Sequence, residues 1–215
     1  MRSLSALCKS KINYFVSKFF LLALGIVLSK CSTTTIDLSD HNYNWHDQRT
    51  LLEKTSDWQL RGRVNVKYQN ESYTPRIQWQ QQGDNYRIRL WGTFNAGNTV
   101  IIGEPKLVTM EHDGDSITAN TPEELVLDNL GYELPISYLE FWVRSLPAPG
   151  SDAELELSVQ NHLSTIKQDG WEIAYLDMRQ FDGVILPRRV VSTGPRNDIR
   201  LRFVGLSWAL NTDEN

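Results

Sequence analysis

The amino-acid sequence predicts a mainly β protein with a few helices, built around an antiparallel sheet of about ten strands. Most segments after residue 57 alternate apolar and polar residues with a period of two, which indicates strands with one buried and one solvated face. Glycine, aspartate and asparagine gather in the short stretches between these segments, where turns are expected. Only three segments, at 45–58, 121–131 and 135–147, have the character of helices.

The clearest strand runs from residue 58 to residue 68. Its apolar side chains occupy even positions and its polar side chains odd positions, so we expect one face of the strand to be buried. Gly62 interrupts the apolar series and indicates a bend or a close approach of another segment. The apolar positions are Trp58, Leu60, Val64, Val66 and Tyr68.

The same alternation continues in the segments 73–79 and 86–90, which are separated by a turn at 83–85. Pro75 indicates a sheet edge or a bulge, because proline cannot donate a hydrogen bond to a strand ladder. Further strands are expected within 99–104, 106–112, 116–119, 163–176, 183–193 and 198–208.

The three helices have distinct signals. The segment from 45 to 58 is a short helix that leads into the first strand. Thr121 and Glu124 form the pattern of a capping box around a proline, and Gly131 is suited to end that helix. The helix after Leu134 is apolar over more than one face and is ended by Pro147, so we expect it to lie across the sheet and close one side.

The first 30 residues differ from the rest of the chain. They contain five basic and no acidic residues, and residues 19–28 form an uninterrupted apolar run. That run is too short to span a bilayer and fits the h-region of an export signal, with a membrane anchor or a buried helix as alternatives. Cys31 follows directly, with Lys30 in place of a small residue, and the arrangement resembles a bacterial lipobox.

This reading divides the chain into three parts. We expect a lipoprotein signal peptide at 1–30, a lipidated N-terminus with a flexible tether at 31–44, and one domain at 45–210. Acylation is expected at Cys31, and the absence of aspartate after it implies, by resemblance to bacterial lipoproteins, sorting to the outer membrane. The other cysteine would leave with the signal, so no disulfide is expected.

Charge limits the classes of partner. Removal of the signal would change the formal net charge from −4 to −9. Such a domain repels nucleic acid and anionic lipid at long range, so we expect no nucleic-acid partner and no membrane contact through a basic patch.

Catalytic signals are weak. The histidines have no partners at metal-ligand spacing, and the adjacent Glu123 and Glu124 fit the first turn of a helix better than an acid–base pair. No nucleophile or nucleotide-binding motif is found. We therefore expect neither metal, cofactor nor enzymatic activity, although catalytic carboxylates need no local motif.

Two features suggest contact with lipid. Residues 92–98, GTFNAGN, place Phe94 in a polar loop between two strands, where it either folds back over the core or projects outward. Five of the seven tryptophans lie at strand ends, where their rings either pack in the core or line the mouth of an acyl-chain cavity. These five are Trp58, Trp79, Trp91, Trp171 and Trp208.

Residues 58–208 resemble the LolB family of outer-membrane lipoproteins. The resemblance rests on WQLRGRVNV, IQWQQQGDNYRIRLWG, TPEELVLDNLGYELPISYLEFWVRSLPAP, KQDGWEIAY and LPRRV, in this order and spacing. It implies an incompletely closed, strongly curved antiparallel β-barrel of about 10–11 strands, covered by helices over a hydrophobic cavity. It also implies a protein that receives lipoproteins from the periplasmic carrier LolA and inserts them into the outer membrane.

The resemblance assigns roles to particular residues. The family's protruding loop is Gly-Pro-Leu-Gly-like, and the matching positions here are Gly92, Thr93, Phe94 and Asn95, with phenylalanine in place of the apolar leucine. Ser145 stands where the family's WxxGxPAP pattern has glycine. For the acyl-chain cavity we expect Trp58, Trp79, Leu90, Leu139, Trp142, Val143 and Leu146.

The expected partners are a lipoprotein-loaded LolA-like carrier, the acyl chains of its cargo and outer-membrane lipid, and the protein is expected to be a monomer facing the periplasm. Two other classes of protein remain as alternatives. One is a periplasmic carrier of lipid or another hydrophobic ligand, which would need a cavity but not Phe94. The other is a structural envelope lipoprotein, which would have a filled core and bind no acyl chain.

Overall fold

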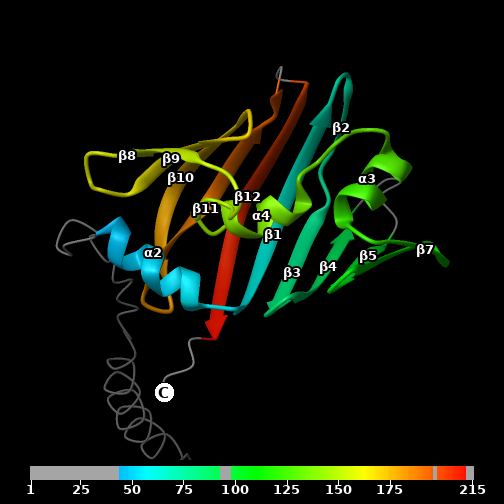
Figure 1. Ribbon diagram of the computed structural model, residues 1–215, viewed down its shortest axis with the longest axis horizontal. Coiled ribbons are helices and arrows are strands. Elements are labelled where there is room, and N and C mark those ends of the chain that lie inside the picture. The colour runs from blue at the N-terminus through cyan, green and yellow to red at the C-terminus, as the bar shows by residue number, and fades with distance from the viewer. Residues whose placement is uncertain (1–43, 93–97, 196–197, 212–215) are drawn as a thin grey trace, which may run out of the picture. The chain divides into compact units, whose positions relative to one another are not determined.

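The computed structural model describes residues 44–92, 98–195 and 198–211 (Figure 1). The predicted signal peptide, Cys31 and most of the tether lie outside the described residues. So do Thr93, Phe94 and Asn95 of the predicted membrane loop, whereas Gly92 at its start is described. The description below concerns the unit from Asn42 to Asn215.

The sheet has 12 strands, in the spatial order β7-β6-β5-β4-β3-β1-β12-β11-β10-β9-β8, with β2 paired to β1 beside this path. All pairs are antiparallel. The strands are β1 (Asp57–Tyr68), β2 (Glu71–Tyr73), β3 (Arg76–Gln82), β4 (Asn85–Trp91), β5 (Thr99–Glu104), β6 (Leu107–His112), β7 (Asp115–Ala119), β8 (Ala153–Leu157), β9 (Leu163–Gln168), β10 (Trp171–Phe181), β11 (Val184–Thr193) and β12 (Ile199–Asn211).

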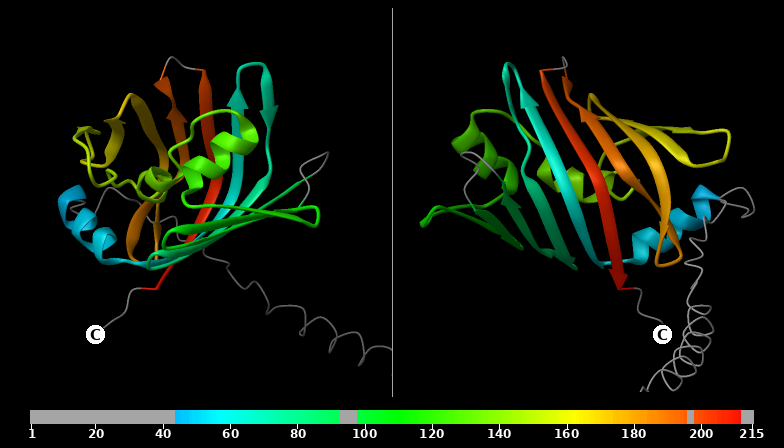
Figure 2. Two further views of the ribbon diagram at one scale, coloured as in Figure 1. Left: turned by 45° about the vertical axis from the view of Figure 1, so that its right-hand side comes forward. Right: turned by 180° about the vertical axis from the view of Figure 1, so that it is seen from behind.

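The sheet is curved and remains open. Its outermost strands, β7 and β8, are not paired with each other, so the sheet does not close into a barrel. Figures 1 and 2 show the strands bending around the side on which α3 and α4 lie. The predicted fold class, a mainly β protein with an incompletely closed, curved antiparallel sheet, is confirmed, but the sheet has 12 strands rather than the predicted 10–11.

The alternation in the sequence becomes a division between two faces of the sheet. Residues paired across neighbouring strands point to the same face. Ile88, Trp79, Leu60 and Trp208 form one such row through β4, β3, β1 and β12, and all four are buried. These side chains belong to the single core cluster, which extends from Trp45 to Leu210.

Gly62 allows β1 and β12 to approach each other closely, as its position in the sequence predicted. The pairing of β1 with β12 shifts between Arg61 and Arg63, as in a β-bulge. A Cβ atom at Gly62 would lie 2.7 Å from Leu206 Cδ2 and 3.0 Å from the carbonyl oxygen of Val204. A side chain at this position would therefore separate the two longest central strands.

Three helices lie in the described residues: α2 (Trp45–Lys54), α3 (Pro122–Leu130) and α4 (Ile136–Trp142). In α3 the predicted N-terminus is confirmed, because the Thr121 hydroxyl accepts a hydrogen bond from the amide of Glu124 at 3.2 Å. Gly131 ends this helix with φ 76°. None of the three has the length and apolarity needed to cross a membrane.

The helix α4 is shorter than predicted. It ends at Trp142 rather than near Pro147, because Ser145 has φ 63°. The amide of Leu146 donates to the carbonyl of Phe141, and the amide of Ser145 donates to the carbonyl of Trp142. This pair of bonds is a Schellman motif with serine at the position where glycine is usual.

Candidate functional site

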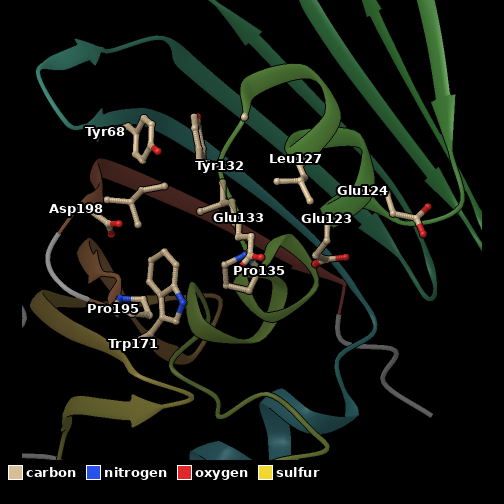
Figure 3. A pocket seen from close by; sticks show the side chains of 13 residues that line it. Tyr68, Glu123, Glu124, Leu127, Tyr132, Glu133, Pro135, Trp171, Pro195 and Asp198 are labelled. Carbon is tan, nitrogen blue, oxygen red and sulfur yellow. The ribbon is translucent and has the colours of Figure 1, made fainter.

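A cavity of about 660 Å³ lies where α3 and the segment after it face the ends of β1 and β12 (Figure 3). This volume falls within the range of about 300–1,000 Å³ that is usual for small-molecule sites. The cavity combines an aromatic and aliphatic wall with an acidic rim. Its lining residues are Tyr68, Glu123, Glu124, Leu127, Gly131, Tyr132, Glu133, Leu134, Pro135, Trp171, Pro195, Asp198 and Ile199.

The apolar wall is built from segments distant in sequence. The rings of Tyr68 and Tyr132 lie 4.6 Å apart, and the hydroxyl of Tyr132 is 3.2 Å from that of Tyr73. Burial is the main cause that raises the pKa of Tyr132, and the hydrogen bond to Tyr73 adds to it. This hydroxyl is therefore neutral throughout the physiological range. Leu127 on α3 is 45% exposed and gives the cavity an accessible apolar side chain.

The acidic rim also holds α3 and α4 together. The carboxylate of Glu123 accepts a hydrogen bond from the amide of Ser137 at 2.8 Å and another from its hydroxyl at 3.2 Å. Figure 3 shows Glu123, Glu124, Glu133 and Asp198 around the opening. Among the described residues, no group of histidine, cysteine or carboxylate side chains could hold a metal ion.

The inner wall of the cavity continues into the core through Trp171. Its ring lies 5.7 Å from that of Trp142 on α4. The indole nitrogen of Trp142 donates to Gln168 Oε1 at 2.8 Å, and the hydroxyl of Tyr175 donates to the carbonyl of Trp142 at 2.8 Å. The position of Trp171, and with it one wall of the cavity, therefore depends on how α4 packs.

The residues predicted for the acyl-chain cavity do not line this one. Six of them belong to the core cluster and are at most 4% exposed: Trp58, Trp79, Leu139, Trp142, Val143 and Leu146. Leu90 is partly buried and packs against that cluster. Trp79 also borders a cavity of about 220 Å³, and Leu146 one of about 480 Å³. These predicted acyl-chain residues thus form the packed layer between the sheet and α4.

Sequence reasoning missed most of the cavity wall. Tyr132 and Leu134 lie in a short connection with no periodic pattern, and Ile199 begins a strand whose partners are far away in sequence. Trp171 alone carried a signal, because it is a large ring at the start of a strand. It is one of the five tryptophans at strand ends for which the sequence predicts a place either in the core or at a cavity mouth, and it lines the cavity.

The base of the predicted membrane loop is described on both sides. Gly92 directly follows β4, Asn98 directly precedes β5, and both residues are exposed. Trp91 pairs with Arg76 at the end of β4, and the guanidinium of Arg89 lies 5.9 Å from the centre of the Trp91 ring. The loop therefore leaves the sheet beside a tryptophan and two arginines.

A hydrophobic core under a curved open sheet, with a partly apolar cavity at its helix-covered side, is an arrangement typical of proteins that bind apolar ligands. Residues 56–208 match the family model described as "Outer membrane lipoprotein LolB". The chain therefore belongs to the LolB family.

Two related protein sequences support this assignment. The chain is 36% identical to the outer-membrane lipoprotein LolB of Chromohalobacter salexigens over 194 residues, which cover 89% of this chain and 90% of that protein. It is 31% identical to the LolB of Stutzerimonas stutzeri, with 86% and 91% covered. Among solved structures, a LolA superfamily protein from Nitrosomonas europaea matches with 8% identity and a TM-score of 0.48, covering 78% of this chain and 92% of that chain.

Proposed function

We propose that this chain is an outer-membrane lipoprotein that accepts lipoproteins from a LolA-like periplasmic carrier and inserts them into the outer membrane. It acts by binding and release rather than by a chemical step. Membership of the LolB family, together with a cavity of about 660 Å³ on the helix-covered side of the sheet, is the observation that carries the proposal. Cys31 would carry the acyl anchor that keeps the domain at the membrane.

The cavity suits the acyl end of a lipoprotein. Its wall offers aromatic and aliphatic surface from Tyr132, Leu134 and Trp171, while its rim is polar. An acyl chain would bury its methylenes against this wall, and each buried methylene contributes about 0.8 kcal/mol. The polypeptide of the cargo would remain outside, beside the acidic rim.

The packed layer under α4 offers a second place for acyl chains. The predicted acyl-chain residues there are covered by α4, whose Trp142 is fully buried. We propose that they contact cargo only when α4 moves away from the sheet, so that the cavity extends toward the core. The contact between Trp171 and Trp142 joins the two regions.

The loop that begins at Gly92 would deliver the cargo. In this proposal Phe94 inserts into the acyl layer of the membrane and orients the cavity toward it. Burial of a phenylalanine side chain contributes about 1.5–3 kcal/mol, which is enough for transient docking and too little for permanent attachment.

The test is transfer of a lipoprotein from a loaded carrier into outer-membrane vesicles, with wild type compared with Phe94→Glu. Loss of the burial energy predicts that transfer slows by roughly 10- to 100-fold. Phe94→Leu is the matched control, because it keeps a large apolar side chain and should transfer at nearly the wild-type rate. Both variants must first take cargo from the carrier as the wild type does.

The alternatives give different results. Unchanged transfer by Phe94→Glu would contradict the insertion mechanism and would favour a carrier that needs only the cavity. If a fluorescent fatty acid shows no saturable binding, both the insertion mechanism and the simple carrier are contradicted. A structural envelope lipoprotein is then favoured.

A further inference from the structure

The outer face of the central strands, opposite the helices, is basic. Cross-strand pairs place these side chains on one face: Trp91, Arg76, Arg63, Val204 and Arg189 form one row across β4, β3, β1, β12 and β11. We define the basic face by its exposed basic residues, which are Arg61, Arg63, Lys67, Arg76, Arg87, Arg89, Arg189, Arg200 and Arg202.

Two like-charge pairs stand directly opposite each other on this face. Arg63 pairs with Arg76 between β1 and β3, and Lys67 pairs with Arg200 between β1 and β12. Like charges in directly opposed positions of an antiparallel sheet destabilise it. Two such pairs on neighbouring strands therefore conflict with sheet stability, and conflicts of this kind mark sites under functional constraint.

No structural partner offsets this repulsion. Among the residues that the structure describes, none of the basic face forms an ion pair. The carboxylates on this side of the sheet lie around the basic face, such as Asp57 at the start of β1, Glu111 on β6 and Glu172 on β10. From the net charge alone we expected no membrane contact through a basic patch; the sheet nevertheless gathers exposed basic side chains on one face of a domain that is acidic as a whole.

The basic face is open and joins the base of the predicted membrane loop. The view from behind in Figure 2 shows the central strands without a covering helix, since α3 and α4 lie on the other side. Trp91 and Arg89 lie together where the chain leaves β4. Tryptophan is enriched at membrane–water interfaces, and arginine beside it can meet the phosphates of lipid headgroups.

We propose that the basic face is a docking surface for the anionic headgroups of a membrane. The choice of a membrane over an acidic protein rests on the position of Trp91 within the same rows and on the membrane anchoring of the proposed function. Docking through this face would hold the domain in one orientation beside its anchor. Phe94 and the cavity would then act from a fixed position.

The test uses residues 42–215, which form one compact unit and contain the whole core cluster. Cosedimentation is measured with vesicles of phosphatidylcholine alone and with vesicles that also contain phosphatidylglycerol. The variant Arg63→Gln, Arg76→Gln, Arg89→Gln should partition roughly 100-fold less to the anionic vesicles, because each basic residue near such a surface contributes roughly fivefold. Glutamine is tolerated on this face, since Gln78 and Gln80 already occupy it.

A matched control removes the same charge elsewhere. The variant Arg49→Gln, Lys54→Gln, Lys106→Gln changes α2 and the turn after β5, and it should partition like the wild type. Wild-type binding should also weaken as salt is added. Equal binding to both vesicle types, or unchanged binding by the variant of the basic face, would overturn the proposal. Binding to poly-glutamate but to neither vesicle would overturn it in favour of an acidic protein partner.

Binding of a fluorescent fatty acid by the same variants separates this inference from the proposed function. Both variants should bind the fatty acid like the wild type, and only the variant of the basic face should bind the anionic vesicles more weakly. That result would show that the basic face and the acyl-chain site act independently, as proposed. If the wild type binds the fatty acid but not the vesicles, the membrane inference fails and the proposed acyl-chain site stands.

Discussion

The guanidinium of Arg144 donates a hydrogen bond to the backbone carbonyl of Thr55 at 2.9 Å and so joins the end of α4 to the end of α2. A second bond from the same nitrogen reaches the carbonyl of Leu52 at 3.0 Å. The last carbonyls of a helix lack the amide of a following turn, and here Arg144, just beyond α4, donates to two carbonyls at the end of α2; the Leu52 carbonyl also accepts from the amide of Thr55 at 3.2 Å. The side chain of Arg144 is 5% exposed and lies 5.3 Å from the centre of the Trp58 ring.

Arg144 should be essential for the stability of the domain. Arg144→Ala removes both bonds to α2 and the packing on Trp58, and it leaves the Glu140 carboxylate without its partner. We expect the free energy of unfolding to fall by about 3–5 kcal/mol, the usual effect of breaking a buried charged contact. Urea unfolding followed by tryptophan fluorescence measures this change.

An exposed arginine provides the comparison for Arg144. Arg49 on α2 forms an ion pair with Glu53 at 2.7 Å, and its side chain is 39% exposed. Arg49→Ala should cost less than about 1 kcal/mol, because exposed ion pairs contribute little. Equal effects of the two substitutions would show that Arg144 does not join α2 to α4 in the folded protein.

Glu140 should make stability depend on pH. Burial raises the pKa of Glu140, although the neighbouring Arg144 lowers it in part. The folded protein therefore keeps this proton to a higher pH than the unfolded chain, so Glu140 favours folding at low pH and opposes it as pH rises through the folded-state pKa. Glu140→Gln should be more stable relative to the wild type at neutral pH than at about pH 4. Urea unfolding at both values measures the difference, and a constant difference would contradict a raised pKa.

Ser145 occupies a position that costs the fold some stability. Its φ of 63° lies in the left-handed region, and its buried hydroxyl has no hydrogen-bond partner. Ser145→Gly removes both costs and should raise the free energy of unfolding by about 1 kcal/mol, after the larger entropy of an unfolded glycine is counted. Ser145→Ala, which loses only the hydroxyl, should gain less. Thermal unfolding of the two variants separates the cost of the backbone strain from the cost of the unpaired hydroxyl. A glycine variant that is less stable than the wild type would contradict both costs.

Local patterns predicted most elements of this fold. The even-numbered apolar positions of β1 are buried or half-buried as expected, because alternation directly reports which face of a strand is covered. Two strands were missed for different reasons. β2 has three exposed residues and no apolar alternation, whereas β8 has the alternating sequence AELEL but is only five residues long and largely exposed.

The cavity and the basic face could not be predicted in the same way. Both depend on which strands are neighbours and in what register, and a shift of one residue would invert each face. Arg63 and Arg76 become adjacent only through the pairing of β1 with β3, and Tyr68 meets Tyr132 only through the chain after α3. Neither the net charge of the domain nor the alternation along a single strand shows that these residues become neighbours.

Leu127 provides a test of the cavity that leaves the loop and the basic face unchanged. Its side chain lines the cavity and is 45% exposed, so Leu127→Trp should fit without disturbing the core. The larger ring would displace about two methylenes of a bound chain and weaken binding of a fluorescent fatty acid roughly tenfold. Leu51→Trp on α2, where Leu51 is 38% exposed and lines none of the described cavities, is the control. If both variants bind like the wild type, the fatty acid occupies the layer beneath α4 instead.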